Sequence, residues 1–250
     1  METPASAATF VIGVGVEKCG TTSISRFLRE SGMIGPGIKE LHAFHHFHFL
    51  SRERYLKKLG YSGGGGIYGE WTPGYSQNPS TIWNLSCILP EAKILFSLRN
   101  PIERAFSSYR HAVRAGHIPT TETFDEVVDD VLAGTARPWV RNLLHMGRYD
   151  RQLQRVYAHY DPATVMVIDF ERLKQESTRV VLEDELLAFT GLHRVPGVAV
   201  RQVNAASKRP DAPQSASTEI SSEAKAKLIQ HYAETRAALS AMVPFELNWW

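Results

Sequence analysis

The chain has 250 residues, of which 43% are hydrophobic and 22% are charged, and its formal net charge at pH 7 is +2. This length and composition predict one α/β domain over residues 1–250, with a sizeable core. So small a net charge argues against binding nucleic acid or a membrane surface through bulk electrostatics, so local groups must hold any anionic ligand. The two cysteines exclude a disulfide framework, and a reducing cytoplasm suits this composition.

The first predicted element is a buried strand over residues 10–16, an apolar run too short to cross a bilayer. No Lys or Arg precedes it, so we do not expect a signal peptide, and we expect residues 1–8 to be a flexible N-terminus. A glycine-containing loop follows, and residues 21–31 then carry apolar side chains at helical spacing. The chain therefore opens as strand, loop and helix.

Two further buried strands are predicted over residues 93–98 and 165–169, each followed by a helical pattern. Pro101 lies at the first turn of the helix after residues 93–98, where proline is favoured. Residues 221–243 are predicted to form a closing amphipathic helix. Short apolar strands that alternate with helices predict a P-loop-type, three-layer α/β fold, in which helices cover both faces of a central parallel sheet. Ligands of such folds gather at the carboxyl ends of the strands.

The loop after the first strand, residues 15–22 (GVEKCGTT), is a candidate phosphate site. Its backbone N–H groups and the following helix dipole favour phosphate-like oxygens. In the Walker A pattern lysine directly precedes Ser or Thr, whereas here the lysine lies inside the loop, which favours a different nucleotide chemistry. The candidate ligands are Lys18, Cys19, Gly20, Thr21, Thr22 and Ser23.

A second phosphate signature follows the strand over residues 93–98. Arg99 stands at the carboxyl end of that strand and Ser107 lies two turns into the next helix, so a guanidinium and a hydroxyl can converge on one phosphate. Taken alone, Arg99 would be interpreted as a surface ion pair and Ser107 as an ordinary helix residue. Two phosphate signatures in order on the expected elements favour nucleotide binding. Arg104 is interpreted as structural.

Residues 17–23 (EKCGTTS) and 99–109 (RNPIERAFSSY) resemble the two nucleotide segments of sulfotransferases that use 3′-phosphoadenosine 5′-phosphosulfate (PAPS). The resemblance spans roughly residues 9–209 and is nearer to the heparan-sulfate-type and bacterial branch than to the cytosolic aryl branch. It implies that PAPS is the donor, that 3′-phosphoadenosine 5′-phosphate (PAP) is the product and that no metal is needed. It also implies a role for Lys18 at the leaving phosphate oxygen.

The same resemblance implies that Arg99 and Ser107 bind the 3′-phosphate of the donor. Residues 204–209 (NAASKR) resemble a later loop that folds over the nucleotide, in which Lys208 and Arg209 are additional phosphate ligands. We therefore expect residues 203–217 to form a mobile loop over the nucleotide. A solvated basic pair is the alternative interpretation.

Residues 39–44 (KELHAF) resemble the heparan-branch segment that carries the catalytic base, which implies that Glu40 is the base and that His42 assists it. An acceptor hydroxyl or amine must lose a proton during in-line sulfuryl transfer, so a base is required. Residues 69–75 (GEWTPGY) align with a family segment in which a lysine stands at the position of Trp71 here. This departure puts a polysaccharide acceptor in doubt. It leaves Glu70 as a possible second base or as a packing residue.

The acceptor is expected to be a small or carbohydrate-like molecule with a hydroxyl or an amine. The predicted acceptor-binding residues are Phe44, Glu70, Trp71 and Tyr75. His42 and His46 have the spacing of a zinc-binding helix, but H-E-x-x-H is absent and phenylalanines are interleaved, so we predict an aromatic wall and no metal site.

Two other functions remain open from the sequence. A P-loop kinase or NTPase would use Asp169, at the end of the strand over residues 165–169, to hold magnesium, although Asp169 is interpreted as structural. A non-catalytic nucleotide-binding protein would keep the two phosphate segments and lack turnover.

Overall fold

The computed structural model describes residues 7–36, 40–44, 50–201 and 216–250. Contacts group the chain into two compact units, Met1–Leu98 with Gln152–Val203 and Arg99–Arg151 with Asn204–Trp250. Among the described residues, no helix combines the length and the apolar character that a membrane span requires.

The first unit contains a four-stranded parallel sheet in the order β2-β1-β3-β4. Its strands are β1 (Ala8–Gly15), β2 (Gly66–Trp71), β3 (Lys93–Leu98) and β4 (Val165–Asp169). Three of them match the predicted apolar runs. Strand β2 was not predicted, because its sequence GIYGEW contains glycines and a glutamate instead of an apolar run. It forms by pairing with β1, with Gly13 opposite Trp71.

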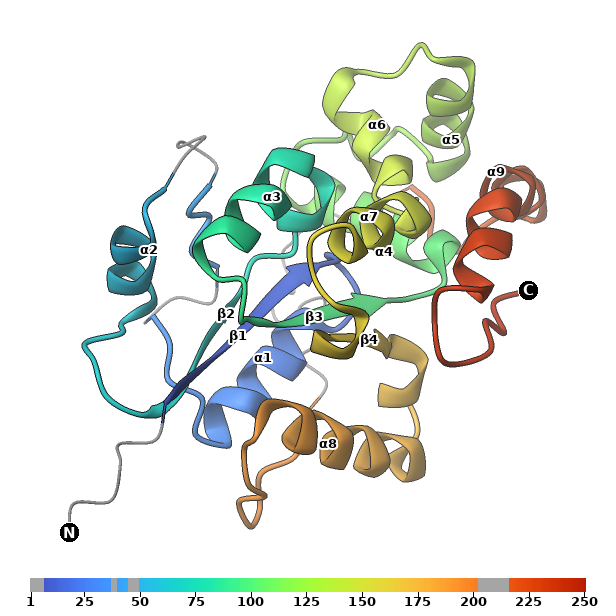
Figure 1. Cartoon of the computed structure of the whole chain (residues 1–250). Coiled ribbons are helices and arrows are strands. Elements are labelled where there is room, and N and C mark those ends of the chain that lie inside the picture. The colour runs from blue at the N-terminus through green and yellow to red at the C-terminus, as the bar shows by residue number, and fades with distance from the viewer. Residues whose placement is uncertain (1–6, 37–39, 45–49, 202–215) are drawn as a thin grey trace, which may run out of the picture. The chain divides into compact units, whose positions relative to one another are not determined.

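Helices cover both faces of this sheet, as predicted (Figure 1). Helices α1 and α8 lie on one face, where their leucines and isoleucines pack on Val11, Leu95 and Ile168, and α3 lies on the other face. The helices of this unit are α1 (Thr21–Glu30), α2 (Arg52–Leu59), α3 (Pro79–Ile88), α8 (Glu176–Thr190), the last part of α7 (Tyr149–Tyr157) and the short η1 (Tyr75–Gln77), η2 (Pro162–Thr164) and η3 (Phe170–Leu173).

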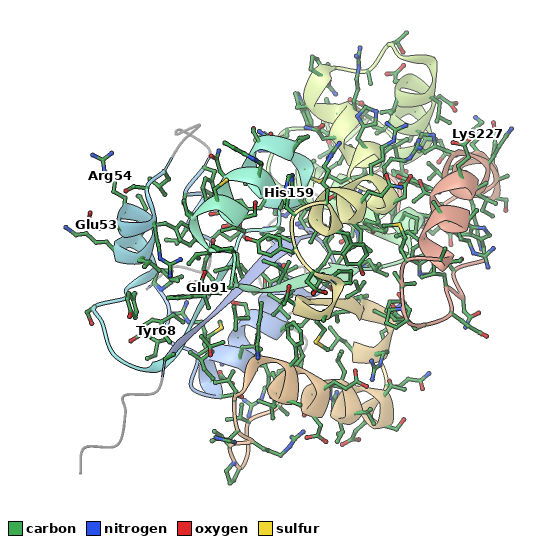
Figure 2. All side chains as sticks on the ribbon, in the orientation of Figure 1. Glu53, Arg54, Tyr68, Glu91, His159 and Lys227 are labelled. Atoms are coloured by element: carbon green, nitrogen blue, oxygen red, sulfur yellow. The ribbon has the colours of Figure 1, made fainter. Side chains whose placement is uncertain are left out.

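Helix α2 shows how a short polar helix is held on the sheet. Glu53 and Arg54 project away from the rest of the chain (Figure 2), while Tyr55 and Leu59 on the other side of the helix are fully buried. Ser51 caps the helix by accepting from the N–H of Arg54. The buried tyrosine thereby directs its hydroxyl into the interior of the unit.

The second unit is helical. It contains α4 (Pro101–Arg114), α5 (Phe124–Ala133), α6 (Pro138–His145) and α9 (Ser222–Ser240). Helix α4 agrees with the predicted helix that starts at Pro101, and α9 agrees with the predicted closing helix. Asn100 caps α4 by accepting from the N–H groups of Ile102 and Glu103. Tyr109, Phe124 and Tyr232 lie in one apolar core of this unit. Most of the predicted loop over residues 203–217 lies outside the described residues.

Candidate functional site

The loop between β1 and α1 has a backbone suited to an anion. Lys18 and Gly20 both adopt left-handed conformations, with φ of 65° and 76°. A non-glycine residue rarely has positive φ, and such turns direct successive N–H groups toward one concave point. Gly20 is also the N-cap of α1, whose dipole favours negative charge at that end. The loop is thus shaped for phosphate-like or sulfate-like oxygens.

Strand β3 holds this loop at two points. The N–H of Val16 donates to the carbonyl oxygen of Ser97 over 3.0 Å, and the hydroxyl of Ser97 donates to the carbonyl oxygen of Cys19 over 2.5 Å. Cys19 is fully buried, and its thiol lies 3.6 Å from the carbonyl oxygen of Glu17. These contacts fix the backbone on both sides of Lys18.

Gly20 is required for a second reason besides its left-handed backbone. A Cβ at this position would lie 2.8 Å from side-chain carbons of both Phe170 and Leu173 in η3. Real Cβ atoms essentially never approach other heavy atoms so closely. Helix α1 therefore starts directly against η3, and no larger residue fits at its N-cap.

Trp71 lies beneath the phosphate loop with only 1% of its surface exposed. Its indole N–H donates to the carbonyl oxygen of Gly15 over 3.0 Å. Its ring occupies the space that a side chain at Gly13 would need, since a Cβ there would lie 2.1 Å from the ring. Trp71 thus supports the phosphate loop from below. Its contact with an acceptor stays a prediction.

Glu40 and His42 form a carboxylate–imidazole pair. Nε2 of His42 lies 3.2 Å from Oε2 of Glu40, and the side chains of His42 and Glu40 are 46% and 32% exposed. The pair is therefore accessible to a substrate proton. His42 has φ of 46°, and its N–H donates to Oγ1 of Thr72 over 3.3 Å.

Thr72 connects this pair to β1, the strand that leads into the phosphate loop. Its own N–H donates to the carbonyl oxygen of Gly13 over 3.0 Å, two residues before β1 ends. Glu40 and His42 therefore lie at the carboxyl ends of β1 and β2, the edge from which the loop with Lys18 also leaves. Neither Thr72 nor Ser97 was predicted from the sequence to be a site residue, although Thr72 follows Trp71 directly and Ser97 is two residues before Arg99.

Glu70 lies below the same segment and is 3% exposed. Its carboxylate accepts from the hydroxyls of Tyr55, over 3.0 Å, and Thr72, over 2.8 Å. The Tyr75 hydroxyl and the N–H of Leu41 also donate to it. Burial raises the pKa of Glu70 from 4.5 to about 7, and these hydrogen bonds oppose the shift.

The remaining predicted acceptor residues are also buried. Phe44 is 7% and Tyr75 is 1% exposed. The ring of Phe44 lies between those of Tyr55 and Tyr75, at centroid distances of 5.6 and 5.2 Å. The Tyr75 hydroxyl accepts from the N–H of Ala43 over 3.0 Å. The structure shows these rings packing under the segment of Glu40 and His42, so their contact with an acceptor also stays a prediction.

The predicted 3′-phosphate residues lie in the second unit. Arg99 is at the carboxyl end of β3, and its guanidinium lies 3.3 Å from the carboxylate of Glu103. A partly exposed pair of this kind contributes at most about 1 kcal/mol, so a phosphate can compete for the guanidinium. Ser107 is half-buried on α4. Arg104 is fully buried and donates to the carbonyl oxygen of Leu143, which is a structural role.

Two interpretations considered from the sequence concern metals, the magnesium site of an NTPase and the zinc-like spacing of His42 and His46. Oδ1 of Asp169 accepts from the N–H of Glu171 over 3.0 Å and so caps η3, which agrees with its structural interpretation. Within the described ranges, no group of three His, Cys, Asp or Glu side chains is arranged to hold a metal ion. His46, Lys208 and Arg209 lie outside those ranges.

The model of the family described as "Sulfotransferase domain" matches residues 9–231. The chain belongs to the sulfotransferase family. Family membership confirms the predicted enzyme class, in which a sulfuryl group is transferred.

Relatives of this sulfotransferase include the bifunctional heparan sulfate N-deacetylase/N-sulfotransferase 1 of Caenorhabditis briggsae, 24% identical over 181 residues, and that of Xenopus tropicalis, 26% identical over 184 residues. Each alignment covers 67% of this chain, and the chain spans about a fifth of the length of these relatives (21% and 20%). These relatives carry a heparan sulfate N-sulfotransferase activity in their names, and their branch is the one that the motifs of this chain resemble.

A sulfotransferase structure from Alicyclobacillus acidocaldarius shares the fold. It superposes with a TM-score of 0.73 at 24% identity, and the alignment covers 97% of this chain and 98% of that chain. The predicted α/β fold is therefore confirmed by an independent solved structure.

Proposed function

We propose that this sulfotransferase moves a sulfuryl group from PAPS to a hydroxyl or an amine of a small or carbohydrate-like acceptor. One observation carries the proposal: the loop that contains Lys18 and the accessible pair of Glu40 and His42 lie at the carboxyl ends of the adjacent strands β1 and β2, where Thr72 bonds to His42 and to Gly13 of β1. A cation for a leaving group and a base for an acceptor are the two groups that sulfuryl transfer needs.

The loop fits a donor of this chemistry. Its left-handed residues direct N–H groups to one point, and Lys18 adds a cation to these donors. PAPS supplies the sulfuryl group and leaves as PAP. Arg99 and Ser107 are assigned to the 3′-phosphate from their motif, and Lys208 and Arg209 to further phosphate contacts.

In the proposed reaction Glu40, assisted by His42, takes the proton of the acceptor hydroxyl or amine. The new bond from the acceptor oxygen or nitrogen to sulfur forms as the bond from sulfur to the phosphate oxygen breaks. Lys18 stabilises the negative charge that develops on that phosphate oxygen, an interaction that strengthens in the transition state. The acceptor enters opposite the leaving group, so Glu40 and Lys18 act on opposite sides of the sulfur.

The acceptor class rests on the relatives. Their names include a heparan sulfate N-sulfotransferase activity, which supports a carbohydrate-like acceptor with an amine. The accessible pair of Glu40 and His42 suits removal of a proton from an ammonium or from a hydroxyl. The proposal therefore includes both O- and N-sulfation.

The test combines nucleotide binding with turnover. PAP at a hundredfold excess over its Kd should stabilise the fold by about 2.7 kcal/mol, and ATP with magnesium at equal concentration should do much less. Incubation with PAPS and a panel of amine- and hydroxyl-bearing sugars and metabolites should yield a sulfated product by mass spectrometry. If ATP with magnesium stabilised the fold and PAP did not, the protein would be an NTPase. PAP binding without transfer to any acceptor would favour a non-catalytic nucleotide-binding protein.

A further inference from the structure

A buried carboxylate lies under the segment that carries the candidate base. Glu70 is the next-to-last residue of β2 and is almost completely buried. It is in contact with donors from three separate parts of the chain: Tyr55 from α2, Thr72 and Tyr75 after β2, and the backbone N–H of Leu41. Buried carboxylates are costly unless hydrogen bonds satisfy them, so this cluster has to be formed for the unit to be stable.

The donors of Glu70 are themselves the groups that hold residues 40–44. Thr72 donates to Glu70 and accepts from the N–H of His42. Tyr75 donates to Glu70 and accepts from the N–H of Ala43. Three consecutive backbone N–H groups, from Leu41 to Ala43, are thus bound by Glu70 directly or through one hydroxyl.

This arrangement fixes an unfavourable backbone. His42 has φ of 46°, a left-handed conformation that a residue other than glycine adopts only where its surroundings impose it. The three hydrogen bonds to residues 41–43 are such surroundings. The left-handed turn in turn brings the His42 imidazole within 3.2 Å of Glu40.

We propose that Glu70 is a positioning residue, whose buried carboxylate holds residues 41–43 in the conformation that pairs Glu40 with His42. The inference rests on the proposed function, because it assigns Glu40 the role of base. Glu70 is not the base itself, since it is buried and four donors surround its two oxygens.

The cluster also explains why a carboxylate is needed. An ionised carboxylate only accepts, and its two oxygens offer acceptor sites for all four donors. A glutamine at this position has the same shape but offers a single acceptor oxygen, and its NH₂ group would face donors. Glu70→Gln should therefore release part of the segment without creating a cavity.

Glu183 supplies a matched control. It is a buried carboxylate of the same unit, 1% exposed, on α8. It accepts from the N–H of Val200 over 2.7 Å and pairs with Arg194 at 3.2 Å, and these partners lie outside residues 40–44. Glu183→Gln therefore changes a buried carboxylate whose partners, Val200 and Arg194, are separate from the candidate base.

The first measurement does not depend on activity. Hydrogen exchange of the Leu41, His42 and Ala43 amides is followed by NMR in the wild type, Glu70→Gln and Glu183→Gln, each under conditions where it is folded. In Glu70→Gln these amides should exchange roughly tenfold faster or more, as expected when hydrogen bonds that hold a segment are lost. In Glu183→Gln their exchange relative to the core amides should not change. Unchanged exchange in Glu70→Gln would overturn the inference.

The second measurement is transfer from PAPS. Glu70→Gln should lower kcat by roughly 10- to 100-fold, as misplacement of a catalytic group does, while the Kd for PAP stays near that of the wild type. Thr72→Val, which removes one relay hydroxyl, should lower kcat in the same direction, and Thr72→Ser should restore it.

The outcomes separate the two proposals. Loss of kcat in Glu40→Gln with a normal kcat in Glu70→Gln would support the proposed function and overturn the inference. The opposite outcome is faster amide exchange in Glu70→Gln together with normal sulfuryl transfer in Glu40→Gln. It would support the anchoring of the segment by Glu70 and overturn the proposed role of Glu40.

Discussion

The hydroxyl of Ser97, at the end of β3, donates to the carbonyl oxygen of Cys19 in the phosphate loop over 2.5 Å. Ser97 is fully buried, so its removal leaves a buried carbonyl without this donor. Ser97→Ala should lower the free energy of unfolding by about 1–3 kcal/mol. It should also lower turnover, because the backbone next to Lys18 loses a fixed point. Urea unfolding and steady-state kinetics check both effects, and an unchanged free energy of unfolding would show that the bond contributes nothing.

Lys18 is proposed to act on the transition state. Lys18→Met should lower kcat by about two orders of magnitude or more, since one preorganised electrostatic donor is lost, while PAP affinity changes much less. The control is Lys58→Met, which removes the same charge from the exposed side of α2. If PAP affinity collapsed and turnover at saturation survived, Lys18 would be a binding residue only.

Arg99 and Ser107 are proposed to select the 3′-phosphate. PAP should stabilise the wild type by about 2.7 kcal/mol at a hundredfold excess over its Kd, and adenosine 5′-phosphosulfate at equal concentration should do much less. Arg99→Ala should remove this difference, and Ser107→Ala should reduce it. Arg110→Ala, an exposed change on the same helix, should preserve it. Equal stabilisation of the wild type by both nucleotides would contradict the assignment.

Glu40 is proposed to be the base. Glu40→Gln should lower turnover by a factor of about 10² to 10⁴, the usual contribution of a general base, and leave PAP binding nearly unchanged. His42→Ala should cost less if the imidazole only orients the carboxylate or the acceptor. Glu53→Gln, on the exposed side of α2, is the control. Near-normal turnover in Glu40→Gln would contradict this assignment.

The buried Glu70 predicts a dependence of stability on pH. Its pKa rises from 4.5 in the unfolded chain to about 7 in the folded protein, because burial disfavours the charge. Between these values the folded state binds more protons, so the free energy of unfolding falls as pH rises from about 4.5 to about 7, by roughly 3 kcal/mol from this group. Burial also raises the pKa of Tyr55 and Tyr75, which stay protonated throughout.

Glu70→Gln removes that titration. The difference in unfolding free energy between the wild type and Glu70→Gln, measured by urea at several pH values, should therefore slope over this range and level off outside it. A difference that does not change with pH would show that Glu70 keeps an ordinary pKa.

The sequence by itself determined the local elements. Residues that are neighbours in the sequence are enough to predict β1 from its apolar run and α1 from its helical spacing. They also predict the start of α4, from its asparagine and proline. Such patterns sufficed for the fold class, for three of the strands and for both phosphate segments. Each phosphate segment directly follows a predicted strand, so its place at the carboxyl end of that strand could be predicted.

Only the tertiary structure decided which groups meet across long distances in the sequence. Strand β2 was not predicted because its hydrogen bonds come from β1, and Trp71 is internal because Gly13 on that strand leaves room for its ring. The residues next to Glu70 in the sequence do not distinguish an exposed base from a buried carboxylate that anchors a segment. Its burial follows from Tyr55 of α2 and the backbone of residue 41, whose contacts with it form only when the chain folds.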